Sequence, residues 1–196
     1  MSLNRRSFHK RVAGGLLSCF IGGKTVLLTP AEATQKKIPF RILTPGEGRL
    51  LSLLGDALVP GAREAGLAHY VDHQLSDTTE RNMLMLRYLG VRPPFTDFYR
   101  SALGAVAQSL EQAAGRPMDA VFENPPAEKE LEDYIARLSR ENPPGWDKME
   151  NAPPAPFFYF VLRADALDVT YGTREGFERL DIPYLAHIEP QRRSWS

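Results

Sequence analysis

Cysteine is almost absent from this 196-residue chain. The single thiol, Cys19, lies near the N-terminus, and residues 34–196 contain none. A domain without thiols cannot form disulfides, thiolate zinc sites, cysteine-ligated iron–sulfur clusters or covalent c-type haem, and it has no cysteine nucleophile. We therefore expect a fold that is held together by packing alone.

The chain also has no net charge and no long hydrophobic run. Its 24 basic and 24 acidic residues cancel, and beyond residue 33 the balance is mildly acidic. An acidic domain without a basic stripe is poorly suited to phosphate backbones, so we expect no nucleic-acid partner. Apolar residues make up 43% of the chain, which is typical of a globular protein, and the length fits one domain.

The common catalytic motifs are missing as well. There is no G-x-S-x-G elbow and no P-loop, and the Gly46–Gly48 fragment lacks the strand and third glycine of a dinucleotide fingerprint. Asp165 and Asp168 stand beside Arg163, a pattern more typical of helix capping or ion pairs than of acid–base catalysis. Without a nucleophile and base or a phosphate cradle, the sequence predicts no catalytic and no cofactor-binding residues.

A histidine pair keeps one enzymatic alternative open. His69 and His73 are four residues apart on a predicted helix, so both rings could reach one metal ion. A protein metal site needs three or four ligands, and no convincing third ligand accompanies the pair. We predict no metal site, with an exported metal-dependent enzyme as the alternative.

The N-terminus has the pattern of an export signal. Paired arginines precede a phenylalanine and a lysine, as in the signals that direct folded proteins to the twin-arginine (Tat) translocase. The residues of this motif are Arg5, Arg6, Phe8 and Lys10.

A modest apolar stretch over 12–28 follows, and Ala31 and Ala33 form an A-x-A cleavage site. We expect cleavage after Ala33, so that residues 1–33 are the signal peptide and 34–196 the exported domain. Because the stretch is interrupted by glycines and a lysine, it is too short for a permanent membrane span. A retained basic amphipathic anchor is the alternative.

Hydrophobic spacing predicts a mainly α domain. Thr44, Pro45 and Glu47 form a capping box that begins a helix, and Gly115 ends another. The apolar run at 157–162 is compatible with a central strand or a helix buried on all sides, and its continuation to Leu167 favours the helix. The expected helices cover 44–58, 62–75, 76–90, 96–114, 128–141 and 157–167, with loops at 116–127 and 142–156 and an extended, proline-containing tail over 182–196.

Two stretches of the domain resemble a known family. The first comprises Leu53–Pro60, Gly61–Gly66 and Tyr70–Asp72, and the second runs from Asp168 to Glu178 and continues through Ile182–Tyr184. These segments resemble subunit 3, the small or gamma subunit, of gluconate 2-dehydrogenase and related flavoprotein complexes. The likeness extends over residues 43–195.

The chain departs from the family pattern at several positions. These departures broaden the expected substrate of the complex to a sugar, a sugar acid or a cyclic alcohol. They are Val169, Thr173, Arg174, Phe177 and Asp181.

The resemblance implies a complex with three kinds of subunit. A large GMC-type flavoprotein would bind FAD and oxidise the substrate, and a cytochrome c subunit would carry haem. This chain would be a non-catalytic subunit without a cofactor that assists export and stability of the large one. It would reside in the periplasm, held at the outer face of the inner membrane through the complex.

The C-terminal block is the expected partner-binding region, because aromatic residues on an extended tail are suited to anchoring an interface. The alternative is that the tail wraps its own domain. A transient export or assembly factor is a further possibility for the whole chain. The expected contact residues are Tyr171, Gly172, Tyr184, His187 and Trp195.

Overall fold

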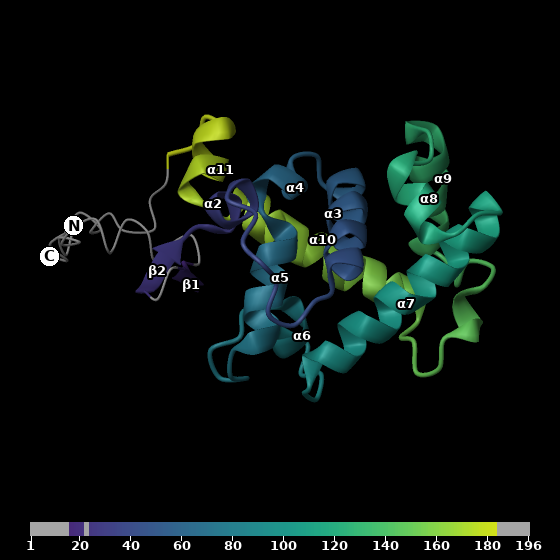
Figure 1. Cartoon of the computed structure of the whole chain (residues 1–196), viewed down its shortest axis with the longest axis horizontal. Helices are drawn as coiled ribbons and strands as arrows, with labels where there is room; N and C mark the ends of the chain where they lie inside the picture. The colour runs from purple at the N-terminus through teal and green to yellow at the C-terminus, as the bar shows by residue number, and fades with distance from the viewer. Residues whose placement is uncertain (1–15, 22–23, 184–196) are drawn as a thin grey trace, which may run out of the picture.

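The computed structural model describes residues 16–21 and 24–183, and this part of the chain is mainly helical (Figure 1). Two strands, β1 (Leu17–Ile21) and β2 (Lys24–Leu28), pair antiparallel near the N-terminus. The helices run in the order α2 (Pro30–Gln35), α3 (Pro45–Leu58), α4 (Ala62–Ala65), α5 (Leu67–Ser76), α6 (Met85–Tyr88), α7 (Phe95–Ala114), α8 (Met118–Glu123), α9 (Glu128–Leu138), the 3-10 turn η1 (Trp146–Lys148), α10 (Ala155–Tyr171) and α11 (Arg174–Arg179).

The best-marked helices form where their end signals predict them. At the start of α3 the Thr44 hydroxyl accepts a hydrogen bond from the Glu47 amide, and the Glu47 carboxylate accepts one from the Thr44 amide. The long helix α7 ends at Gly115, whose φ of 64° is left-handed. These signals depend only on neighbouring residues, which is why they are readable in the sequence.

The predicted helix over 62–75 is wrong in one respect, because Gly66 divides it into α4 and α5. The φ of Gly66 is 89°, and a β-carbon there would lie 2.2 Å from the carbonyl carbon and oxygen of Pro30. Only glycine fits both the left-handed backbone and this close approach of α2. The break therefore depends on a contact with residues more than thirty positions away.

The predicted helix over 76–90 is shortened to α6. Residues before it form turns that are fixed by side chains: Gln74 accepts from the Met83 amide, and Asn82 donates to the Gln74 carbonyl. Side chains that bond nearby backbone groups compete with helix formation. The predicted loop over 116–127 in turn contains α8.

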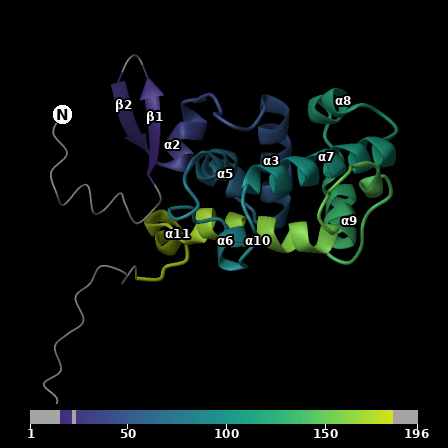
Figure 2. The same ribbon diagram turned by 90° about the horizontal axis from the view of Figure 1, so that it is seen from below.

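The core is centred on α10, which contacts α3, α4, α5, α6, α9 and α11. In Figure 1 this helix crosses behind α3 and α5, and in Figure 2 it runs along one edge of the molecule with α6 and α11 beside it. Tyr99, Trp146 and Phe158 are fully buried, and the Phe158 ring packs against the other two. The predicted apolar helix is confirmed, but it is not covered on all sides, because Phe160 is 50% exposed.

The expected apolar stretch of the signal includes the β1–β2 hairpin, and Ala31 and Ala33 lie in α2. Cleavage after Ala33 stays a prediction. The Tat residues Arg5, Arg6, Phe8 and Lys10 lie outside the described residues, as does the tail beyond Pro183. None of the helices in the described part of the chain is long and apolar enough to cross a membrane.

Candidate functional site

One side of α10 faces away from the core and carries Phe160, Arg163 and Asp168, which are exposed. Leu167 and Tyr171 follow Phe160 at helical spacing, but they are partly buried and pack against the core. Charged residues are ordinary on the solvent side of a helix, whereas the large apolar ring of Phe160 is not. The half-exposed Phe160 is therefore the feature of α10 that internal packing does not explain.

The helices beside α10 add to this surface. Seven large apolar side chains among the described residues are strongly exposed. One of them is on α10, and five others lie on α6 or next to α6 or α11 in the sequence. Both α6 and α11 contact α10. Figure 2 shows these three helices on the same side of the molecule. We call this surface the α10 face. It comprises Met83, Tyr88, Leu89, Phe160, Leu180 and Ile182.

A buried carboxyl group fixes α6 against α10. Asp165, on the inner side of α10, is fully buried and accepts hydrogen bonds from the Met85 amide (2.8 Å) and the Tyr99 hydroxyl (2.5 Å). Burial raises the pKa of Asp165 to about 7, although both hydrogen bonds act in the opposite direction. Asp165 thus caps α6 from α10, because its carboxyl oxygen accepts from the first amide of α6.

Two of the predicted partner-binding residues border the α10 face. Tyr171 is the last residue of α10 and is partly buried, and Gly172 is exposed. A β-carbon on Gly172 would lie 2.6 Å from the Asp168 carbonyl oxygen, so the glycine is explained by the end of the helix. Tyr184, His187 and Trp195 lie outside the described residues. The α10 face itself was not predicted from the sequence. The apolar run at 157–162 was a signal for it, because a helix that buries only one side does not need six consecutive apolar residues.

Three of the four ring nitrogens of His69 and His73 have protein partners, whereas the buried Nδ1 of His73 has none among the described residues. The Nε2 atom of His69 lies 2.8 Å from the Ile38 carbonyl oxygen, which can only accept, so Nε2 carries the proton and Nδ1 accepts from the Thr34 hydroxyl (2.9 Å). His73 Nε2 accepts from the Ser18 amide at 3.2 Å. No group of three or more potential metal ligands occurs among residues 16–21 and 24–183. This geometry does not support the metal-dependent alternative.

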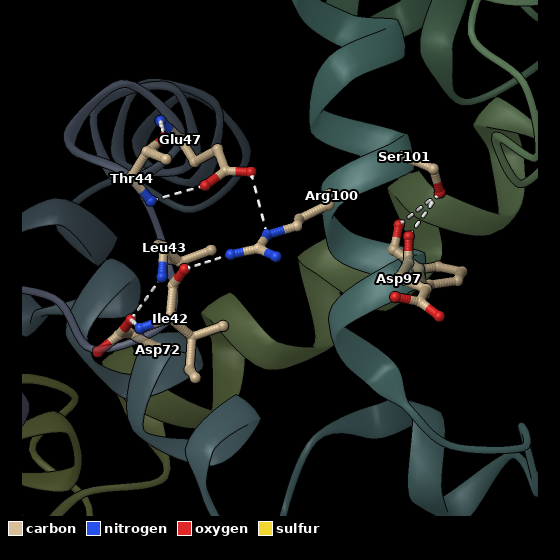
Figure 3. Close-up of polar contacts among 9 residues, drawn as sticks. Ile42, Leu43, Thr44, Glu47, Asp72, Asp97, Arg100 and Ser101 are labelled. Carbon is tan, nitrogen blue, oxygen red and sulfur yellow. Dashed lines mark hydrogen bonds and ion pairs between the residues drawn. The ribbon is translucent and has the colours of Figure 1, made fainter.

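The carboxylate of Asp72, which adjoins the histidine pair in sequence, is also fully used. It accepts three backbone hydrogen bonds, at 2.8–2.9 Å, from the amides of residues 41, 42 and 43. Figure 3 shows the two that come from Ile42 and Leu43. On the other side of this loop, Arg100 donates to the Ile42 carbonyl and lies 3.7 Å from Glu47. These contacts join the loop before α3 to α5 and α7.

A cleft of about 770 Å³ lies between α7, α9 and the proline-rich loop. Its two arginines have partners, since Arg116 donates to the Asn124 carbonyl and Arg137 lies 3.9 Å from Glu141. The mixed lining does not resemble a phosphate cradle.

The fold and surface together define a small helical domain whose main external feature is an apolar face. The chain belongs to the gluconate 2-dehydrogenase subunit 3 family, whose model matches residues 45–186. Membership in this family implies association with the other subunits of a dehydrogenase complex. Comparisons with curated proteins and with solved structures found no match.

Proposed function

We propose that this chain is the non-catalytic small subunit of a periplasmic FAD-dependent dehydrogenase complex. It supplies the Tat signal and stabilises the folded GMC-type flavoprotein, which oxidises a sugar, sugar acid or cyclic alcohol. FAD resides on that partner, and haem c resides on a third subunit where one is present. The complex holds the chain at the outer face of the inner membrane.

The α10 face is the observation that carries this proposal. Large apolar side chains that are exposed on neighbouring helices cost solvation free energy, and a gathering of them commonly marks a protein interface. In a family named for a subunit of a dehydrogenase, the natural occupant of this face is another subunit. Asp165 supports the same role indirectly, because it holds α6 beside α10.

The export role is supported by the motif at Arg5 and Arg6. The absence of cysteine beyond residue 33 excludes a covalent c-type haem on the exported domain. The Tat route exports folded proteins, and the exported domain of this chain has no covalent haem of its own. We therefore infer that the signal serves a folded flavoprotein that is exported together with this chain.

Co-purification with the proposed flavoprotein partner tests the interface. Phe160→Glu places a charge on the α10 face, and we expect the affinity to fall about 30-fold or more, as for an interface anchor. The fold should persist, because Phe160 is already half exposed. Ala113→Glu is the matched control, since it adds the same charge to an exposed position of α7.

Equal recovery of the flavoprotein with both variants would contradict the assignment of the α10 face. Gel filtration of the wild-type pair distinguishes a stable subunit from a transient assembly factor. A stable subunit remains with the flavoprotein, whereas a transient factor aids export and then dissociates.

A further inference from the structure

The expected peptidase site lies inside folded structure. The bond between Ala33 and Thr34 is in the middle of α2, which begins with a complete capping box made by Thr29 and Glu32. The side chain of Ala33 is fully buried. A protease binds its substrate in an extended, accessible form, so neither the backbone nor the side chain at this bond is presented for cleavage.

Polar contacts hold this region against α5. The Thr34 hydroxyl donates to His69 Nδ1, and the Ser18 amide in β1 donates to His73 Nε2. His73 can accept only while Nε2 is unprotonated, and burial, together with Arg41, lowers its pKa and favours that state, opposed by Asp77 and Asp72. The histidine pair thus serves as an acceptor for the segment made of β1, β2 and α2, which we call the docked segment.

Close packing adds to these hydrogen bonds. The Pro30 carbonyl lies so near Gly66 that no side chain fits there. The apolar residues of the docked segment, Leu17, Cys19, Leu28 and Ala33, form a cluster separate from the main core. Release of the segment would therefore leave the core around α10 in place.

We propose that the folded chain hides its own processing site. In this state the docked segment covers the Ala33–Thr34 bond, and cleavage requires α2 to leave α4 and α5 first. The masking of the cleavage site rests on the proposed cleavage after Ala33. The contacts that dock β1, β2 and α2 on α5 do not depend on it. Processing would then follow release of the docked segment and not folding alone.

Cys19 provides a direct probe of docking, because it is the only cysteine in the chain and is buried in the cluster. In the full-length protein we expect alkylation of Cys19 to be at least about tenfold slower than in urea, the factor being set by local opening. The double variant His69→Ala/His73→Ala should label nearly as fast as the unfolded chain while its circular dichroism stays helical. Ser76→Ala is the control, because Ser76 is exposed on α5 and its hydroxyl donates to the His73 carbonyl of the same helix.

Purified signal peptidase in detergent then tests the masking. A synthetic peptide covering Val12–Phe40 presents the same bond together with the apolar stretch of the signal but without the domain, and we expect it to be cut at least about tenfold faster than the folded chain. The double histidine variant should approach the rate of the peptide.

Equal cleavage rates for the peptide and the folded wild-type chain would overturn the proposal. A double variant whose Cys19 reacts freely but whose bond remains uncut would overturn it too. If the peptide is not cut, cleavage after Ala33 is wrong. The alkylation rates of Cys19 would then still test whether the segment is docked.

Discussion

At the scale of single residues, the buried carboxyl group of Asp165 stands out. It has no cationic partner among the contacts described, and it depends on two hydrogen-bond donors from other helices. Burial without an opposite charge favours the neutral form, which is why the pKa rises from 3.8 to about 7. The group therefore couples proton binding to the packing of α6, α7 and α10.

The sign of the resulting pH dependence follows from linkage. Between pH 4 and pH 7 the folded chain keeps a proton on Asp165 that the unfolded chain has lost. The contribution of this group to stability is fully present below about pH 4 and is lost as pH rises to about 7, by on the order of 4 kcal/mol. Acidification in this range strengthens this part of the core.

Asp165→Asn should remove this dependence. The amide keeps an oxygen that accepts from the Met85 amide, and its NH₂ can donate to the Tyr99 oxygen. We expect the difference in unfolding free energy between variant and wild type to change steadily between pH 4.5 and 7.5, with the variant relatively more stable at the higher pH. Urea unfolding at several pH values measures it, with the exposed Asp133→Asn as control. A constant difference across that range would refute the raised pKa.

At the scale of elements, Asp72 determines how the chain enters α3. Asp72→Ala leaves three amide donors of the loop at residues 41–43 without their acceptor, and we expect a loss of about 3 kcal/mol in the free energy of unfolding. Asp72→Asn keeps one oxygen and should cost about 1 kcal/mol. Denaturant titration gives both values. Similar losses for the two variants would mean that the carboxylate's charge matters more than its hydrogen bonds.

Elements with local signals were predictable from the sequence, and elements fixed by distant contacts were not. The capping box of α3 and the glycine that ends α7 each consist of a few neighbouring residues, so they can be recognised in the sequence. The division at Gly66 depends on Pro30, and the short α6 depends on Asp165, eighty positions away. The hairpin was missed because the apolar stretch was interpreted as part of a signal peptide.

The α10 face was likewise predictable only in part from the sequence. The apolar run at 157–162 predicted α10, but which of its sides stays open depends on how the neighbouring helices pack. Tyr171 and Gly172 were predicted from aromatic residues and a family resemblance, and they border the face without forming its centre. Phe160 could be identified only once the arrangement of α6, α10 and α11 was known.

At the scale of the whole molecule, the end of the chain can be tested separately from the domain. Truncation after Asp181 removes Ile182 and everything beyond it while keeping α10 and α11. We expect the melting temperature to change by only a few degrees, because the main core is retained, and co-purification with the flavoprotein to be lost. A truncated chain that recovers the flavoprotein in full would assign the interface to the α10 face without the tail.

Export concerns the chain and its proposed partner together. Arg5→Lys/Arg6→Lys keeps the positive charge but replaces the planar guanidinium groups, which lysine does not mimic. We expect both this chain and the flavoprotein to stay in the cytoplasm, since the signal acts for the folded pair. Cell fractionation with dehydrogenase activity as readout measures this, and Arg11→Lys, outside the paired arginines, should export normally. If the flavoprotein reached the periplasm unchanged in the double variant, it would have its own route and the shared-export role would be wrong.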